Sequence, residues 1–160
     1  MPEIFPEVRS FIDWLQTSVD PLPDALQVLA VFAIGMIPFL EGDVGAGIGI
    51  AAGAPTVATI IAATLGTIVV SLLALQLGGT VGAKRSRSAR ERRVLRRVEK
   101  WGIPIAMFIG GFLVSVPLNV LIMSAAGLNR RIIAIAAVAT AIFNTLFVAV
   151  IVLGVLNFLL

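Results

Sequence analysis

The chain has 160 residues, of which 59% are apolar and only 13% are charged, and its mean hydropathy is +1.05. A soluble domain carries about 25% charged residues, so this composition excludes an ordinary water-soluble globular protein. Cysteine and histidine are both absent, which removes disulfides and the usual zinc ligands. We therefore expect an integral membrane protein with no cofactor and no metal.

Residues 1–24 form the first expected unit, an amphipathic segment. Its apolar residues between positions 3 and 19 recur at spacings of three and four, which is typical of a helix that lies in the membrane interface. The segment is acidic, whereas a signal peptide begins with a basic region, so we expect no signal peptide. Two prolines between Asp20 and Asp24 end the predicted helix.

Residues 25–83 form the first predicted membrane repeat. Their only ionisable residues are Glu41 and Asp43, and the stretch is much longer than the roughly 20 residues that cross a bilayer. Breaks near residues 38–43 and 53–55 leave pieces 25–40 and 44–53 too short for a full crossing, whereas 54–83 is long enough. We predict a re-entrant helical hairpin followed by one transmembrane helix. The residues predicted at the hairpin break are Pro38, Gly42 and Gly45.

Residues 102–160 repeat this plan, with a break at Ser115 and Pro117 and a final apolar span from 132 to 160. A shift of 74 positions aligns residues 51–53 (Ala-Ala-Gly) with 125–127, and residues 61–63 (Ile-Ala-Ala) with 135–137. The predicted fold is therefore an all-α membrane protein of two inverted repeats, each a broken re-entrant hairpin plus one transmembrane helix. Because irregular backbone in a membrane must be covered by protein or water, we expect the two breaks to face each other.

The linker, residues 84–101, carries most of the positive charge. Residues 84–100 contain nine Lys and Arg residues against two Glu, a net charge of +7. We predict a cytoplasmic helix that contacts the bilayer and its anionic headgroups, with no nucleic-acid partner. In the re-entrant plan the N-terminus is outside and Arg130 and Arg131 are cytoplasmic. A rival plan with four full crossings puts both arginines outside, so the charge pattern disfavours it. The predicted location is the inner (cytoplasmic) cell membrane, with several membrane-embedded segments.

Intramembrane acids are costly and usually functional, so Glu41 and Asp43 are the predicted proton-binding residues. Burial favours the neutral form of a carboxyl group, as a proton-coupled carrier requires. Asp43 alternatively caps a half-helix 44–53. Asn119 and Asn144 are predicted substrate or polar partners, although Asn144 can equally be an interhelical hydrogen bond.

The run from Pro38 to Gly53 (PFLEGDVGAGIGIAAG) resembles the first-hairpin signature of the small multidrug export family, a distant relative of the DedA membrane proteins. The segment Val98–Gly102 resembles the linker of that family. The resemblance implies paired re-entrant hairpins and the movement of lipid-like or amphipathic substrates. Asp43 and Gly47 stand where the family pattern has arginine and proline, which argues against an anionic substrate.

The predicted function is a small, proton-coupled secondary transporter that moves an amphipathic or lipid-like substrate by alternating access. The alternative is a non-catalytic accessory subunit of a larger membrane complex. An intramembrane enzyme is disfavoured, because the only acidic pair is two residues apart and His and Cys are absent. Two repeats make a thin bundle, so we expect a homo-oligomer, such as a dimer, or a larger complex.

Overall fold

The computed structural model describes residues 10, 14, 17, 22–38, 40–82 and 102–159. Within these ranges the chain is all-α, as predicted, and contains no strand. Its helices are α2 (Asp24–Gly35), α3 (Glu41–Ala51), α4 (Thr56–Gly82), the helix Gly102–Leu113, α6 (Val116–Ala125) and α7 (Arg130–Leu159). The basic helix predicted at 84–100 lies outside the described residues, as does most of the amphipathic segment 3–19, where Ser10, Trp14 and Thr17 are helical.

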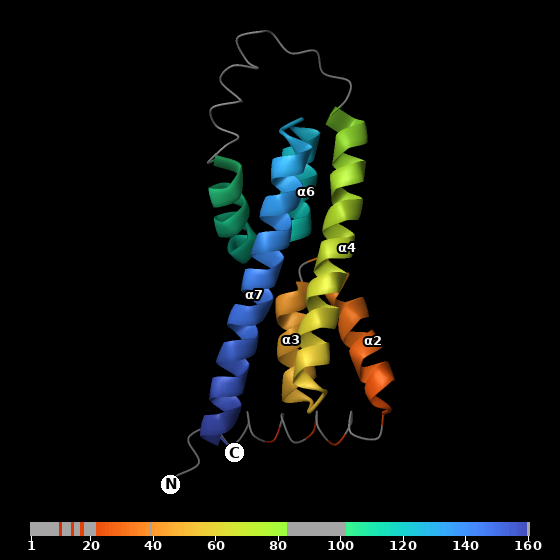
Figure 1. Ribbon diagram of the computed structural model, residues 1–160, viewed down its shortest axis with the longest axis vertical. Coiled ribbons are helices and arrows are strands. Elements are labelled where there is room, and N and C mark those ends of the chain that lie inside the picture. The colour runs from red at the N-terminus through yellow and green to blue at the C-terminus, as the bar shows by residue number, and fades with distance from the viewer. Residues whose placement is uncertain are drawn as a thin grey trace.

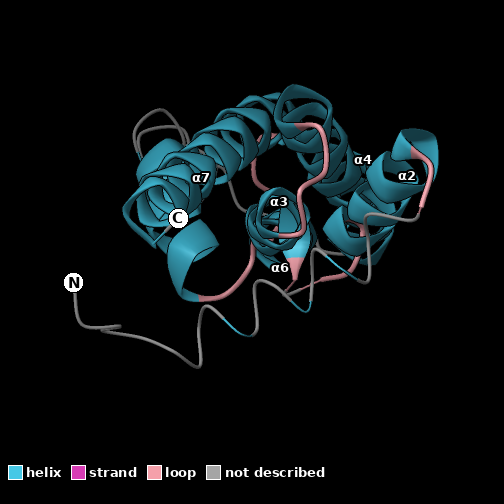
Figure 2. Cartoon of the chain, turned by 90° about the horizontal axis from the view of Figure 1, so that it is seen from below, coloured by secondary structure: helices cyan, strands magenta, loops and turns pink. Residues whose placement is uncertain are grey.

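Two long helices run the length of the molecule, and two pairs of short helices lie at its opposite ends (Figure 1). The α2–α3 pair lies at the end where α4 begins. The helix Gly102–Leu113 and α6 lie at the end where α4 finishes. Seen along the long axis, α3 and α6 lie nearly in line beside α4 and α7 (Figure 2). Both α3 and α6 pack against both long helices.

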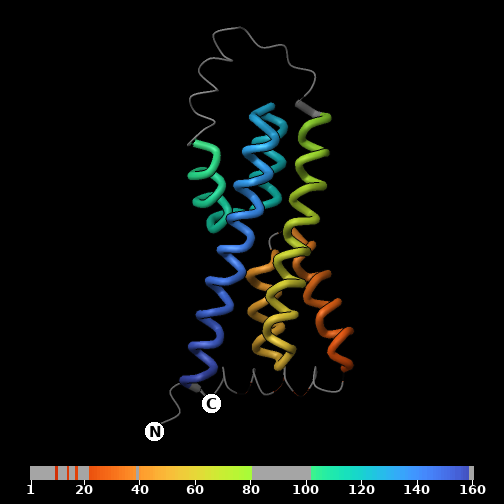
Figure 3. Tube along the Cα trace, in the orientation of Figure 1, coloured from red at the N-terminus to blue at the C-terminus, as the bar shows by residue number. Residues whose placement is uncertain are grey.

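The chain reverses direction at each predicted break, so neither break is a kink in a longer helix (Figure 3). After α2, the Met36 N–H donates to the Phe32 and Ala33 carbonyls, which tightens the last turn before Pro38. At the second reversal, Ser115 is the N-cap of α6, and its hydroxyl accepts a hydrogen bond from the Leu118 N–H at 3.4 Å. Pro117 follows in the first turn, where its missing N–H has no intrahelical partner to lose.

The two short helices α3 and α6 end with the same device. Each is followed by a glycine with positive φ, 86° at Gly53 and 67° at Gly127, a conformation that glycine adopts without steric cost. These glycines are 74 positions apart, and so are Thr56 and Arg130, which begin α4 and α7. The shift found in the sequence therefore coincides with equivalent helix boundaries.

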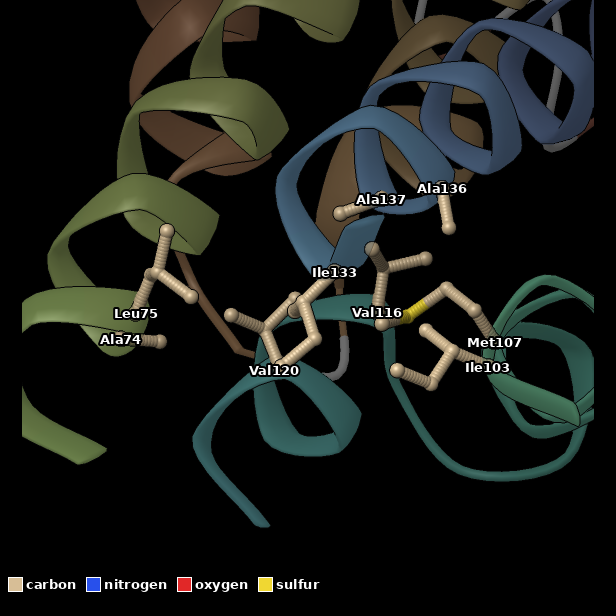
Figure 4. Packing of buried hydrophobic residues seen from close by; sticks show 9 residues of the cluster. All are labelled: Ala74, Leu75, Ile103, Met107, Val116, Val120, Ile133, Ala136 and Ala137. Carbon is tan, nitrogen blue, oxygen red and sulfur yellow. The ribbon is translucent and has the colours of Figure 1, made fainter. Parts of the chain in front are cut away.

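Each half of the molecule has its own buried apolar cluster. The larger cluster joins α4, the helix Gly102–Leu113, α6 and α7 (Figure 4), and its members are Ala74, Leu75, Ile103, Met107, Val116, Val120, Ile133, Ala136 and Ala137. The smaller cluster joins α2, α3 and α4 through Val31, Ala46, Ala62 and Ala63. Because most residues of the smaller cluster are alanines, the backbones of α2 and α3 approach α4 closely.

The segments Thr56–Thr80 and Arg130–Phe158 are long and apolar enough to cross a membrane, judged by length and composition. The helices Asp24–Gly35, Gly102–Leu113 and Val116–Ala125 are apolar but shorter. Large apolar side chains are exposed on both long helices, among them Val57 and Leu77 on α4 and Val150 and Phe158 on α7.

The contact between α2 and α4 predicts a large effect of Gly66→Ala on stability. A β-carbon at Gly66 would collide with the Phe32 carbonyl oxygen and lie 3.0 Å from the Gly35 Cα. We expect G66A to lower the free energy of unfolding by about 1–3 kcal/mol, measured by thermal unfolding in detergent. The control is G154A on α7, where a β-carbon would meet nothing within 4 Å. This variant should gain about 0.5–1 kcal/mol in helix propensity, and a similar result for both variants would contradict the close packing.

Candidate functional site

Glu41 begins α3 at the first reversal and is almost fully buried, with 5% of its surface exposed. Its φ is +45°, the one positive value at a non-glycine position among the described residues. This left-handed conformation costs an L-residue about 1–2 kcal/mol. The strain lets α3 start immediately after the reversal that follows α2. A buried acid in a strained conformation suggests a requirement for the carboxylate itself.

The Glu41 carboxylate joins the two reversals. The Val116 N–H, at the start of α6, donates to Glu41 Oε1 at 2.8 Å, and the Ser115 side chain also forms a hydrogen bond with the carboxylate. The N-terminus of a helix carries a partial positive charge, so this bond is charge-assisted whenever the Glu41 carboxylate is ionised. Ser115 lies 74 positions after Glu41, so residues related by the shift found in the sequence meet at this contact. The expectation that the two breaks face each other is therefore confirmed at this contact.

The long helices hold the first reversal, between α2 and α3, in place; this reversal is called the first tip, and the one before α6 the second tip. The Gly42 N–H donates to Thr67 Oγ1 on α4 at 2.6 Å, and the Thr67 hydroxyl donates to the Gly35 carbonyl at 3.3 Å. A β-carbon at Gly42 would lie 2.5 Å from the Ala63 carbonyl oxygen and 2.9 Å from Thr145 Oγ1 on α7. Only glycine therefore permits this approach, which places Gly42, the residue next to Glu41, between α4 and α7.

Asn144 and Asn119 flank the last turn of the helix Gly102–Leu113. Asn144, on α7, is 2% exposed, and neither atom of its amide group has a hydrogen-bond partner within the described part of the chain. A β-carbon at Gly111 would lie 3.6 Å from Asn144 Nδ2. Asn119, on α6, packs against Gly110, and its Nδ2 is likewise buried without a partner among the described residues. The alternative expectation for Asn144, an interhelical hydrogen bond, is not met within the described residues.

The alternative role of Asp43 as a helix cap is wrong. The half-helix begins at Glu41 rather than at residue 44, so Asp43 lies in its first turn. Its carboxylate accepts a hydrogen bond from the Val44 N–H at 2.8 Å. Asp43 is half-buried, whereas Glu41 two residues earlier is buried. The structure thus brings Glu41, but not Asp43, to the contact between the reversals.

The predicted break residues are only partly at the reversals. Pro38 and Ser115 lie there, and Pro117 lies in the first turn of α6. Gly42 and Gly45 are helical residues of α3, because the left-handed Glu41 lets the helix start earlier than the glycine-rich run suggests. Gly45 instead packs against α2, where its β-carbon would lie 3.3 Å from the Val31 carbonyl oxygen.

Two threonines that shape the site, Thr67 on α4 and Thr145 on α7, are not predicted from the sequence. Both are only 1% exposed. No local pattern distinguishes them from the other threonines of the apolar spans, and only their contact with Gly42 shows their role. Within the described ranges, His, Cys, Asp and Glu side chains form no group of three or more that could hold a metal ion.

Comparisons of the chain with protein-family models, curated proteins and solved structures find no match. The site is therefore interpreted from its own geometry.

The contact between Glu41 and Val116 predicts that Glu41→Leu destabilises the protein more than Glu41→Gln. Leucine leaves the buried Val116 N–H without an acceptor, which costs about 1–3 kcal/mol, whereas the glutamine side chain still offers an amide oxygen. Thermal unfolding of purified protein in detergent measures the difference. The matched control, Asp43→Asn, should unfold close to the wild type, because within the described residues the Asp43 carboxylate bonds to the adjacent backbone and to no other element. Equal unfolding temperatures for the Leu and Gln variants would show that the bond contributes nothing to stability.

Proposed function

We propose that the protein is a small proton-coupled secondary transporter that moves an amphipathic or lipid-like substrate by alternating access. In this proposal the two halves are inverted repeats, and each short helix pair is a re-entrant hairpin. The observation that carries the proposal is the buried Glu41 carboxylate at the point where the two reversals meet.

Three features support a membrane setting. The long helices, at 1.5 Å per residue, measure about 40 Å or more, which exceeds the roughly 30 Å hydrocarbon core. Their exposed apolar side chains are too numerous for the surface of a soluble monomer. Both reversals lie at mid-height of the molecule (Figure 3), and at the first of them Thr67 bonds the Gly35 carbonyl and the Gly42 N–H. Such protein partners are what non-helical backbone requires at membrane depth.

Protonation of Glu41 changes the contact between the hairpin tips. The ionised carboxylate is attracted by the N-terminus of α6 and accepts a charge-assisted hydrogen bond from Val116. Proton binding removes the charge and weakens that bond, so the tips are held together less strongly. Each hairpin reaches from one end of the molecule to its middle (Figure 1). Loosening their contact therefore alters the barrier between the two sides, as alternating access requires.

A purely structural role for Glu41 explains less of the geometry. The helix α6 already has its own N-cap, because the Ser115 hydroxyl accepts from the Leu118 N–H. A glycine at position 41 would avoid the cost of a positive φ, and a neutral side chain would avoid the cost of a buried charge. Proton binding is a reason for the chain to retain an acid there.

The proposed orientation follows the distribution of basic residues. Among the described residues, the only cations are Arg130 and Arg131, at the start of α7. They lie at the end of the molecule where α4 finishes and the sequence continues into the basic segment 84–100 (Figure 1). Arg130 also donates to Gln76 Oε1 on α4 at 2.7 Å. We place this end in the cytoplasm and the start of α2 outside.

Single cysteines test the orientation, because the natural chain has none. Cysteines at Leu22, Ser88 and Ala126 are labelled with an impermeant maleimide in intact cells and, as a control, in permeabilised cells. Two re-entrant hairpins predict labelling of L22C alone in intact cells and of all three after permeabilisation. Labelling of A126C in intact cells, with L22C protected, would establish four full crossings and remove Glu41 from a hairpin tip.

Transport is tested in vesicles that contain the purified protein and an NBD-labelled glucosylceramide as a lipid-like probe. Movement of the probe between leaflets is followed by dithionite quenching, with and without an imposed pH gradient. We expect the gradient to accelerate movement in the wild type and in D43N, and the acceleration to be lost in E41Q, whose side chain cannot ionise. Gradient-dependent movement that persists in E41Q would refute the role of Glu41. No movement in the wild type would favour the accessory-subunit alternative, which predicts a stoichiometric partner on purification from native membranes.

A further inference from the structure

Asn144 and Asn119, beside the helix Gly102–Leu113, have buried amide atoms that form no hydrogen bond with the described residues. Asn144 presents an unpaired Nδ2 donor and an unpaired Oδ1 acceptor, and Asn119 presents a second unpaired Nδ2 donor. A buried amide without a partner costs free energy, so two of them near one turn indicate a polar group that binds there. Both lie against the adjacent glycines Gly110 and Gly111.

The set of unpaired groups restricts the chemistry of the ligand. A metal ion or an ammonium group would satisfy the acceptor of Asn144 but leave both N–H donors unpaired. An anion would pair with the donors. However, the described cations, Arg130 and Arg131, lie at the start of α7, more than two turns from Asn144, and the acid Glu41 is bound at the neighbouring tip. A neutral group that both donates and accepts, such as a hydroxyl or an amide, fits all three.

An exposed apolar surface lies on the helix Gly102–Leu113 and on α7, the helix that carries Asn144. Phe108 and Phe112 come from the helix Gly102–Leu113, and Phe143 and Phe147 come from α7. Their rings form a continuous set of contacts with centroid separations of 5.0–6.2 Å. Each of these side chains is 41–48% exposed. Phe112 follows Gly111 and Phe143 precedes Asn144, so the exposed rings and the buried Asn144 amide belong to adjacent residues along the seam between the helix Gly102–Leu113 and α7.

We infer that this seam binds a neutral, hydroxyl-bearing amphiphile, with its head group on Asn144 and Asn119 and its alkyl chain along the four phenylalanines. The inference rests on the proposed function and specifies its substrate class. It also assigns the route of entry, from the apolar surroundings between the helix Gly102–Leu113 and α7.

Three probes that share one alkyl chain and differ in head group test the inference: monooleoylglycerol, oleate and oleylamine. Binding to the full-length protein in detergent is measured by thermal shift and by native mass spectrometry, with no proton gradient. We expect monooleoylglycerol to bind about tenfold more tightly than oleate or oleylamine, as expected for one to two additional hydrogen bonds. Equal binding of all three probes would mean adventitious adsorption of the alkyl chain only and would overturn the inference.

Matched substitutions on α7 locate the binding. N144L should remove the preference for monooleoylglycerol and raise the unfolding temperature without ligand, because it removes a buried unpaired amide. N157L, the same change at an exposed asparagine of α7, should do neither. F147A should weaken all three probes, unlike F158A, which lies outside the ring contacts and is 73% exposed. If N144L still prefers monooleoylglycerol, the same measurement is made on N119L. A preference for monooleoylglycerol that persists in both variants would overturn the inference.

The inference about the substrate class and the proposed transport mechanism can be contradicted independently of each other. Head-group selectivity is measured in the wild type without a proton gradient, whereas the role of Glu41 is tested by gradient-dependent movement in E41Q, so each result stands without the other. Loss of gradient-dependent movement in E41Q together with head-group selectivity in the wild type would support both proposals. Intact gradient-dependent movement without head-group selectivity would overturn only the inference about the substrate class.

Discussion

The two halves of the structure are joined at its centre by one hydrogen bond, from the Val116 N–H to the Glu41 carboxylate. It joins two chain reversals that are far apart in sequence and that leave backbone groups without helical partners. An apolar contact at this point would leave those groups unsatisfied, at a cost of a few kcal/mol. A charge-assisted bond to a helix N-terminus removes part of that cost and fixes the register of the two halves.

The apolar packing that stabilises each short helix pair is separate from the polar contact between the two reversals. Each short helix pair is stabilised by its own apolar cluster, one rich in alanine and the other built from larger side chains. The long helices α4 and α7 pack against both α3 and α6, so they hold the two pairs at a constant position relative to each other. Because the apolar clusters and the long helices provide the packing, the contact between the two reversals can depend on a single ionisable group. That division suits the proposed transporter, in which a proton must change the centre without unfolding either half.

The two tips differ in how their polar groups are satisfied. At the first tip, Thr67 satisfies the Gly35 carbonyl and the Gly42 N–H. Beside the second tip, the amide of Asn144 has no partner among the described residues. Natural proteins rarely bury such groups without a purpose, because each weakens the fold. In the proposed mechanism the first tip supplies the proton site and the second supplies the polar half of a substrate site.

The hydropathy of the sequence and its helix-breaking prolines and glycines were sufficient to predict the all-α class, the two long helices and the approximate position of both breaks. They could not place the start of α3, because a left-handed glutamate has no local signature and the following glycines are typical of a turn. Glu41 was predicted as a functional residue from the cost of an acid in an apolar span. Its partner Val116 could not be predicted, since any residue can supply a backbone N–H. The contributions of Thr67 and Thr145 were missed for the same reason, because ordinary threonines acquire a role only through their neighbours.

The sequence by itself determined that this chain forms apolar helices, two of them long, because hydrophobicity, proline and glycine act locally and are readable residue by residue. Only the tertiary structure decided that the two reversals meet at Glu41, that Gly42 and Gly45 serve packing rather than the break, and that Asn144 is buried without a partner. These outcomes depend on contacts between segments that are distant in the sequence, such as the 75 positions that separate Glu41 from Val116. No local pattern in a chain specifies such distances, because they are set by the packing of all the helices together.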